Sequence, residues 1–284
     1  MQFLMQSLRK NRAWGWAGLI LYACAVTFPH APVQDIVGAI AAKITLKRLY
    51  LVSAVIALTM GAGLTLVFVR KLFREPGRRV LSVFWVLTLV LMVATWRVLF
   101  ANNTELVHYP QYFPEGVAVL ALTLSPVEAL AWVVFFGLLD ETFQYIYVVA
   151  GRALPLDFND IYMDLLGGAA GVVFAMAWIG GFRMPRKKVW ARPGVVVICG
   201  IILTTLGLLW SGKVLMYEAP GAPPHWFALS RLKTDTFWYF SPVILGPHHF
   251  HELAPLEGTI LILATIVLYS PLETILRKFL KSGH

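Results

Sequence analysis

Long apolar runs, separated by short clusters of basic residues, constrain this chain more than any other feature of its sequence. Each run is about 20 residues long, the length that an α-helix needs to cross the hydrocarbon core of a bilayer. Hydropathy predicts spans at roughly 14–29, 50–69, 80–100, 105–124, 126–149, 160–181, 194–211 and 257–276. The sequence therefore predicts an all-α, polytopic transmembrane helix bundle of about eight spans.

Composition favours a membrane protein and argues against a nucleic-acid-binding one. The chain is 58% hydrophobic and only 14% charged, whereas a soluble domain carries about 25% charged residues. Its net charge of +9 comes from basic clusters between apolar runs, with no basic stripe on a soluble segment. We therefore expect no nucleic-acid partner. Cys24 and Cys199 fall in different predicted spans at unlike depths, and we interpret them as small apolar residues.

The basic residues also predict the orientation of the bundle. An even number of spans puts both termini on one side, and cytoplasmic loops carry an excess of Lys and Arg. We expect both termini to be cytoplasmic, because the inner segments then hold 16 of the 24 basic residues: Arg9, Lys10, Arg12, Arg70, Lys71, Arg74, Arg78, Arg79, Arg183, Arg186, Lys187, Lys188, Arg192, Arg277, Lys278 and Lys281. Three others lie in the segment 30–49, which we expect to lie amphipathically on the outer surface.

The predicted spans divide the chain into three regions. Residues 1–103 form an N-terminal three-helix region, and residues 104–181 form a three-helix core. Residues 182–284 form a two-helix region with a long outer loop, 212–256, which is rich in Pro, Gly and aromatic residues. Because Trp and Tyr are favoured at membrane interfaces, we interpret this loop as a lid or a docking surface.

Acidic residues gather where the predicted topology places the outer ends of the core helices. On the fifth span, one face carries Gln144 and at least one of Asp140 and Glu141, and Asp160 and Asp164 share one side of the sixth. An ionised Asp at the centre of a membrane helix costs roughly 2.5–3.5 kcal/mol, so such residues usually face a bundle interior and a partner. We therefore expect these acidic faces to meet in a pocket that opens outward.

The fourth span adds further polar groups, and two glycines explain how the helices approach. Glu105, His108 and Tyr112 fall on one side of this span, and Pro110 and Pro114 are expected to kink or break it. On the sixth span, Gly167 and Gly171 have the spacing of a close helix-packing motif. Arg152, Arg97 and a protonated His108 are the candidate cations near the acids.

Several interpretations of this cluster stay open from the residues alone. It is a binding or catalytic site, or a hydrogen-bond network that fixes helix register, or an oxygen-rich metal site. His248, His249 and His251 lack the order of a zinc-protease motif, and no Ser or Cys stands in a hydrolase motif. We therefore assign no metal, no cofactor and no catalytic residue.

The order of motifs in residues 104–175 resembles the VanZ-like family of bacterial integral membrane proteins. His108 and Tyr112 are similar to its first pair, Asp140-Glu141-Thr142-Phe143-Gln144 to its acid-Glu-x-x-Gln motif, and Gly151-Arg152 to its Gly-Arg. Asp160, Asp164, Gly167 and Gly171 are similar to its last helix, which usually has Asn where Asp164 stands. The family also commonly has Lys where Glu105 stands, so both departures make this site more acidic. The resemblance implies an envelope protein of the bacterial inner membrane, without an established catalytic mechanism.

Together these features predict a VanZ-like envelope protein with membrane lipids as partners. In this hypothesis the pocket binds a lipid head group or a cationic envelope molecule, with Arg152 orienting an anion and Glu141 and Asp160 holding the cationic part. His108, Tyr112 and Gln144 supply hydrogen bonds. One alternative is an accessory subunit of a membrane complex that docks through the loop 212–256. Another is an enzyme that uses Glu141 or Asp160 as a general base on a lipid-linked substrate.

Overall fold

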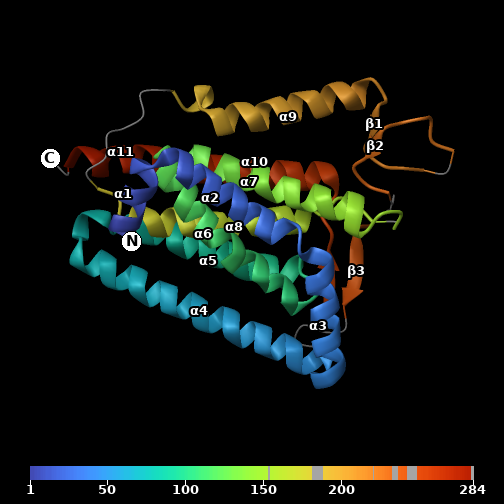
Figure 1. The fold of residues 1–284 in the computed structure, drawn as a ribbon, viewed down its shortest axis with the longest axis horizontal. Helices are drawn as coiled ribbons and strands as arrows, with labels where there is room; N and C mark the ends of the chain where they lie inside the picture. Colours follow the sequence, from blue (N-terminus) through green and yellow to red (C-terminus); the bar gives the residue numbers. More distant parts are fainter. Residues whose placement is uncertain (153, 181–187, 220, 232–235, 242–247, 283–284) are drawn as a thin grey trace.

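The computed structural model describes residues 1–284 except 153, 181–187, 220, 232–235, 242–247 and 283–284. Most of the described chain is helical, which confirms the all-α class, and Figure 1 shows the long helices running side by side. The helices are α1 (Gln2–Lys10), α2 (Arg12–Thr27), α3 (His30–Ile44), α4 (Leu46–Arg74), α5 (Leu81–Val98), α6 (His108–Thr123), α7 (Pro126–Phe143), α8 (Phe158–Met176), α9 (Pro193–Trp210), α10 (Pro255–Tyr269) and α11 (Leu272–Ser282).

Local sequence signals fix where the core helices begin and end. Ser125 caps α7 by accepting a hydrogen bond from the amide of Glu128 at 3.2 Å, and Pro126 occupies the first helical position. Asp157 caps α8 in the same way, with its Oδ1 3.1 Å from the amide of Asp160. At the other end of α7, Gln144–Val148 form one π-helical turn that extends the helix toward the predicted boundary at 149.

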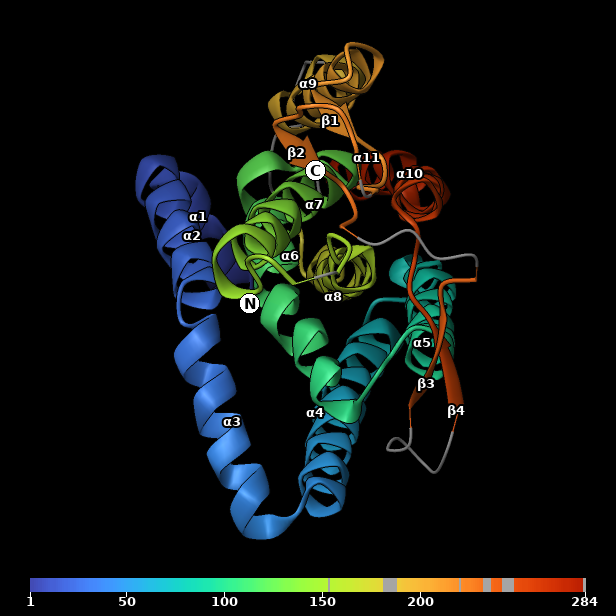
Figure 2. The ribbon, with the colours of Figure 1, turned by 90° about the vertical axis from the view of Figure 1, so that its right-hand side faces the viewer.

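Helix α8 is the central element of the bundle. Figure 2 looks along the bundle and shows α5, α6, α7 and α10 around it, so helices from all three predicted regions pack on α8. Glycines allow α6 to approach closely, because a Cβ on Gly116 would lie 2.0 Å from the carbonyl oxygen of Gly168. A Cβ on Gly171 would lie 2.1 Å from the carbonyl oxygen of Phe113, and one on Gly167 would lie 2.7 Å from that of Tyr109. The glycine face of α8 therefore lies directly against the backbone of α6.

Five helical segments are long and apolar enough to cross a membrane, so the chain is a multi-pass membrane protein. They are Leu46–Arg74, Leu81–Val98, Pro126–Val148, Pro193–Trp210 and Pro255–Leu280, and the pair α2 and α3, bent by 50°, would make a sixth. Helices α6 and α8, predicted as spans 105–124 and 160–181, do not meet this test. Helix α6 has 16 residues and is too short, whereas the polar residues of α8 lower its apolarity. Helix α8 is surrounded by protein, so it does not need an apolar outer face.

The prolines of the fourth predicted span do not interrupt the helix that contains them, so the expectation of a broken helix is wrong. Helix α6 begins at His108 and continues through Pro114 to Thr123. Pro110 lies in the first turn, where an amide needs no partner inside the helix, so its missing N–H costs little. The short 3₁₀ segment η2 (Asn103–Val107) precedes α6 and carries Glu105 outside the helix.

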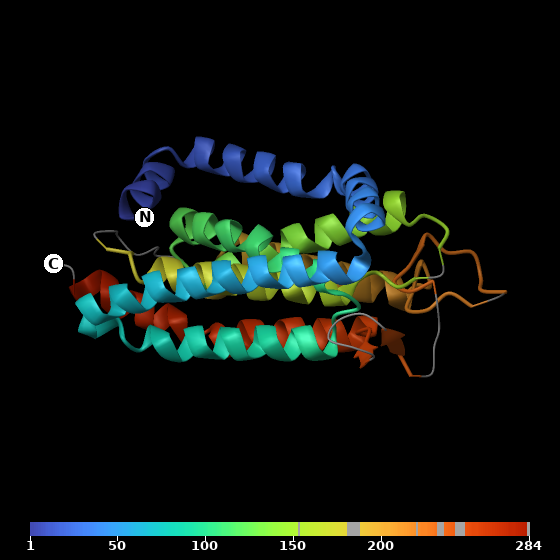
Figure 3. The ribbon, with the colours of Figure 1, turned by 90° about the horizontal axis from the view of Figure 1, so that it is seen from below.

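Basic side chains mark one end of the bundle, here called the basic end. Figure 1 shows α1, the last turn of α4 and α11 together at its left side, and Figure 3 shows the same arrangement from below. Arg9 and Lys10 end α1, Lys71 and Arg74 end α4, and Arg192 precedes α9. Of the predicted basic residues, Arg183, Arg186 and Lys187 lie outside the described residues.

A buried ion pair joins three helices at the basic end. Glu273 on α11 lies 3.2 Å from the guanidinium of Arg192, which is 1% exposed. The same carboxylate accepts hydrogen bonds from the Ser125 hydroxyl and from the Val127 amide. It therefore ties the start of α7 to the start of α9 and to α11.

The described parts of the segment 212–256, which the sequence predicts as an outer loop, lie at the opposite end of the bundle, here called the acidic end. Strand β1 (Val214–Leu215) pairs in parallel with β2 (Phe227–Ala228), and β3 (Trp238–Ser241) pairs antiparallel with β4 (His248–His251). The buried side chain of Asn159 holds this loop, because it donates to the carbonyl of His251 and accepts from the amide of Leu253, both at 2.8 Å. The Tyr145 hydroxyl donates to the carbonyl of Ala228 at 2.9 Å.

Candidate functional site

Five carboxylates from α7 and α8 gather at the acidic end and are here called the acidic cluster: Asp140, Glu141, Asp157, Asp160 and Asp164. The spacing of Asp157, Asp160 and Asp164 places all three on one side of α8, beginning at its N-cap. On α6, which runs parallel to α8, His108 and Tyr112 are four residues apart and face the same region. Helix geometry thus brings together seven polar side chains that are up to 56 residues apart in the sequence.

His108 lies between two of these carboxylates. Its Nδ1 is 2.8 Å from Oδ1 of Asp164, and its Nε2 is 3.3 Å from Oδ2 of Asp160. Asp164 is fully buried, and its Oδ2 faces Gly137 of α7, where any larger residue would collide with it. His108 therefore fixes the register between α6 and α8 and supplies positive charge to the cluster when both of its nitrogens are protonated.

Three carboxylates converge at the outer edge of the cluster. Glu141, Asp157 and Asp160 each offer an oxygen, and these oxygens all lie within 4.8 Å of one another. Glu141 is 3% exposed and accepts a hydrogen bond from the Gln144 side chain at 2.5 Å. Oxygens about 2.3–2.6 Å from a Ca²⁺ ion lie up to about 5 Å apart, so this triad has the donors and the spacing for one cation. An ammonium group, which donates three hydrogen bonds, fits the same acceptors.

Asp140 has a separate set of partners. Its Oδ2 accepts a hydrogen bond from Tyr112 at 3.2 Å, and its Oδ1 lies 3.3 Å from Nδ1 of His30. Sequence reasoning missed His30, because the predicted surface segment 30–49 gave no reason to turn it toward the bundle. The available signal was the dipeptide Pro29-His30, which ends the first apolar run and places a titratable group at the break between α2 and α3.

Glu115 is a second residue that sequence reasoning missed. It lies on α6 seven residues after His108, is 2% exposed, and has electrostatic interactions with Asp164 and Asp140. Its Oε1 has no hydrogen-bond partner within the part of the chain that the structure describes. A single Glu inside a predicted span, on the same helical face as His108, was the signal that pointed to it.

Two further predicted contributors are Arg152, which lies apart from the acidic cluster, and Glu105, which lies near it. Arg152 is exposed, and its side chain makes no hydrogen bond or ion pair with the described residues, so the structure does not bring this cation to the cluster. Glu105 accepts hydrogen bonds from the amide of Ala101 at 3.0 Å and from the side chain of Asn102 at 2.8 Å in a local turn, and it interacts electrostatically with Asp157, Asp160 and His108.

The histidines of the outer loop are arranged as strand residues. His251 contacts Glu257 at 3.0 Å through Nε2 and packs against Trp238, while His249 packs against Phe240. Among described residues, the one group of acids and histidines with metal-ligand spacing is Glu141, Asp157 and Asp160.

The charge balance of the acidic cluster is strongly negative. No Lys or Arg forms an ion pair with its carboxylates among the residues whose placement is described, and the cations in contact are His30 and His108. Burial raises the pKa of Asp157 well above its usual range, and the neighbouring Asp160 and Glu252 carboxylates raise it further. Burial also raises the pKa of Glu252 to about 7, and repulsion from Asp160 adds to this shift. A cation placed among these groups would relieve both effects.

No protein-family model matches the chain, and no match was found among curated proteins or solved structures. The geometry and charge of the acidic cluster are therefore the features of this chain that point to a function.

Proposed function

We propose that this multi-pass membrane protein binds a cationic head group of an envelope lipid, or a similar cationic envelope molecule, in its acidic cluster. One observation carries the proposal: the Glu141, Asp157 and Asp160 oxygens converge within 4.8 Å, and no Lys or Arg of the described chain balances them. Such a site binds a cation because its own charges repel one another in the absence of a ligand.

The energetics favour a binding site over a purely structural network. A buried carboxylate that serves structure alone is stabilised by a matched partner, and losing that partner costs about 3–5 kcal/mol. The acidic cluster has more carboxylates than contacting cations, and the buried oxygens Asp160 Oδ1 and Asp164 Oδ2 have no hydrogen-bond partner among the described residues. A ligand with several hydrogen-bond donors would pair with these unpartnered buried oxygens.

We further propose that the protein is VanZ-like, with eight spans and both termini in the cytoplasm of a bacterium. The motif order at residues 104–175 supports the family, and the basic end supports the orientation, because positive residues favour the cytoplasmic side. In this orientation the acidic cluster opens toward the outer side of the inner membrane. Fusing a reporter enzyme that is active only outside the cytoplasm to each terminus tests the topology, and activity at either end would contradict it.

Ethanolamine is the probe for the proposed function, because it carries the smallest amine found on lipid head groups. We expect ethanolamine to raise the melting temperature of the purified protein, since a ligand that binds only the folded state stabilises it. Glu141→Gln removes one carboxylate of the converging triad and should abolish this stabilisation, whereas Glu75→Gln at the basic end should leave it unchanged. Equal stabilisation of all three proteins, or none, would contradict the proposal. Stabilisation by Ca²⁺ alone would reassign the triad to a metal ion.

A second function, docking to a partner protein, is favoured by the aromatic residues near the outer loop. Trp210 is 95% exposed and Trp226 is 72% exposed. Exposed tryptophans suit a protein interface as well as a membrane interface. Purification in a mild detergent, followed by identification of co-purifying proteins and lipids, separates the two functions. A stoichiometric protein partner that protects 212–256 from proteolysis would favour the accessory subunit.

A further inference from the structure

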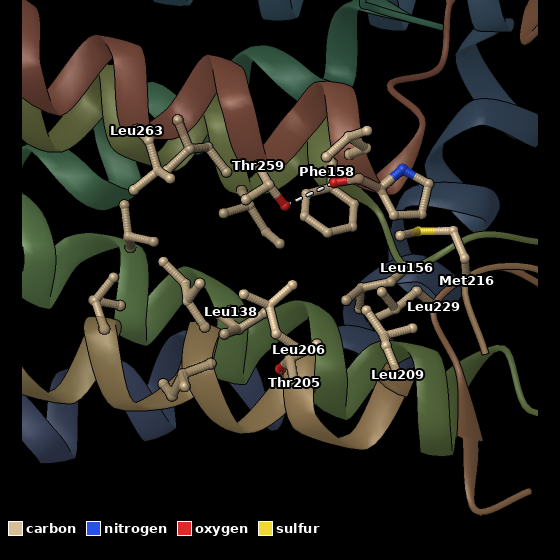
Figure 4. A pocket seen from close by; sticks show the side chains of 18 residues that line it. Leu138, Leu156, Phe158, Thr205, Leu206, Leu209, Met216, Leu229, Thr259 and Leu263 are labelled. Carbon is tan, nitrogen blue, oxygen red and sulfur yellow. Dashed lines mark hydrogen bonds between the residues drawn. The ribbon is translucent and has the colours of Figure 1, made fainter. Parts of the chain in front are cut away.

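A groove lined by apolar side chains runs between α9 on one side and α7 and α10 on the other (Figure 4). Its volume is about 180 Å³, and its walls include Leu138, Ile202, Leu206 and Leu263. The hydroxyl of Thr259 is already paired, because it donates to the carbonyl of Pro255 at 2.7 Å. The groove therefore offers dispersion contacts and almost no hydrogen bonds.

The groove lies within the part of the bundle that crosses the membrane. Helices α7, α9 and α10 all belong to segments long and apolar enough to span a bilayer. Helix α9 stands away from the bundle at the top of Figure 1, and most of its side chains are not buried by protein. An acyl chain from the surrounding lipid is the apolar group available at this depth.

One end of the groove adjoins the acidic cluster. Leu156 and Phe158 both line the groove, and Asp157 stands between them in the chain. Pro255 also lines it, three residues after Glu252. Asp157, Asp160 and Glu252 interact electrostatically with one another, so negative charge is concentrated where the apolar walls end.

A second groove, between α4 and α5, lacks this combination. It is larger, about 470 Å³, and its lining is also apolar. Leu106 lines it and follows Glu105, but both oxygens of that carboxylate already accept hydrogen bonds. Of these two grooves, the one beside α9 therefore combines apolar walls with a nearby carboxylate oxygen, Asp160 Oδ1, that has no hydrogen-bond partner among the described residues.

We propose that the groove and the acidic cluster together form one site for a lipid with an amine head group. The acyl chain lies between α9 and α10, and the amine is held near Asp157, Glu252 and Asp160. This inference rests on the proposed function and narrows the ligand to an aminolipid. Charge complementarity selects the amine, because an anionic head group would be repelled by the same carboxylates.

The test uses a single-chain aminolipid, lysophosphatidylethanolamine, bound to the full-length protein in detergent and counted by native mass spectrometry. We expect it to bind about tenfold or more tightly than lysophosphatidylglycerol, since one charged hydrogen bond is worth at least a factor of ten. Thr205→Phe fills the groove and should weaken the binding of lysophosphatidylethanolamine about tenfold. Thr204→Phe places the same ring on the neighbouring exposed position, outside the groove, and should change nothing.

Soluble ethanolamine separates the two proposals. Thr205→Phe should retain the melting-temperature rise with ethanolamine, which also shows that the variant is folded and its head-group site intact. Asp157→Asn should weaken the binding of both ethanolamine and lysophosphatidylethanolamine, because asparagine keeps the α8 cap but removes the charge. If Thr205→Phe and Thr204→Phe bind the lipid equally, the groove inference is overturned and the proposed function stands. If ethanolamine fails to stabilise the wild-type protein, both are overturned.

Discussion

The two ends of the bundle bury acids in opposite ways. At the basic end, Glu273 pairs with Arg192 at 3.2 Å and also accepts from Ser125 and the Val127 amide. At the acidic end, five carboxylates share two contacting histidines and have no contacting Lys or Arg among the described residues.

This difference distinguishes a carboxylate whose charge is balanced within the protein from carboxylates whose charge a bound cation would balance. In the Arg192–Glu273 pair the negative charge is balanced by the folded protein itself, although Glu273 Oε2, like oxygens of the acidic cluster, has no hydrogen-bond partner among the described residues. A crowded group of carboxylates is satisfied only by protons or by a cation from outside. The sign of a stability change on removing one acid therefore tells the two kinds of site apart.

The largest expected effect is at the basic end. Glu273→Ala removes a partner from the buried Arg192 side chain and should destabilise the protein by about 3–5 kcal/mol. Thermal unfolding in detergent, followed by tryptophan fluorescence, measures this loss. Glu75→Ala, which removes partly exposed ion pairs at the same end, should cost less than about 1 kcal/mol. Equal losses for the two variants would remove the distinction between buried and exposed pairs.

The next effect tests whether the acidic end depends on close helix packing. Gly116→Ala puts a Cβ 2.0 Å from a backbone oxygen of α8, so we expect the protein to lose about 1–3 kcal/mol and α6 to move from α8. Binding of ethanolamine should weaken as well, because His108 and Tyr112 move with α6. Gly200→Ala on α9, where nothing lies within 4 Å, is the matched control. An unchanged melting temperature in Gly116→Ala would show that the α6–α8 contact is not tight.

A change of opposite sign is expected within the acidic cluster. Glu141→Gln removes one like charge from the converging triad and should stabilise the ligand-free protein by on the order of 1 kcal/mol, while ligand binding is lost. The same thermal unfolding measurement reports it. Destabilisation as large as that of Glu273→Ala would mean that Glu141 is part of a structural network.

The pH dependence should follow the raised pKa values at the acidic end. In the folded state the pKa of Glu252 is about 7, above its ordinary value of 4.5, so the folded protein binds more protons than the unfolded chain between these values. Stability of the ligand-free protein should therefore fall as pH rises from about 4.5 to 7, whereas ethanolamine binding should strengthen. Glu252→Gln should flatten both trends, and a variant that keeps the full pH dependence would exclude Glu252 as their source.

The smallest expected effect concerns Arg152. Because its side chain is exposed and forms no hydrogen bond or ion pair with the described residues, Arg152→Ala should change stability by less than about 0.5 kcal/mol and leave ethanolamine binding intact. If Arg152→Ala loses lysophosphatidylethanolamine binding but keeps ethanolamine binding, Arg152 has the anion-orienting role suggested by the family resemblance.

Some of this site was predictable because helix periodicity is a local property. The spacing of Asp160 and Asp164, and of His108 and Tyr112, shows which residues share a face without knowledge of the fold. The glycines at 167 and 171 likewise identify the face of α8 that now lies against α6. Sequence analysis missed His30, Glu115 and the Arg192–Glu273 pair. Their partners lie on other helices, and the spacing of residues along the sequence does not predict contacts between helices.

The sequence by itself determined a helical membrane protein, since the length of an apolar run and the depth of a bilayer are matched by simple geometry. It also determined that acids and bases would separate toward opposite ends. The tertiary structure decided which charges are matched, because pairing depends on how helices rotate and approach across distances that one chain segment does not encode. It also placed the apolar groove beside Asp157 and left Arg152 outside, since the rotation of each helix is set by packing against its neighbours.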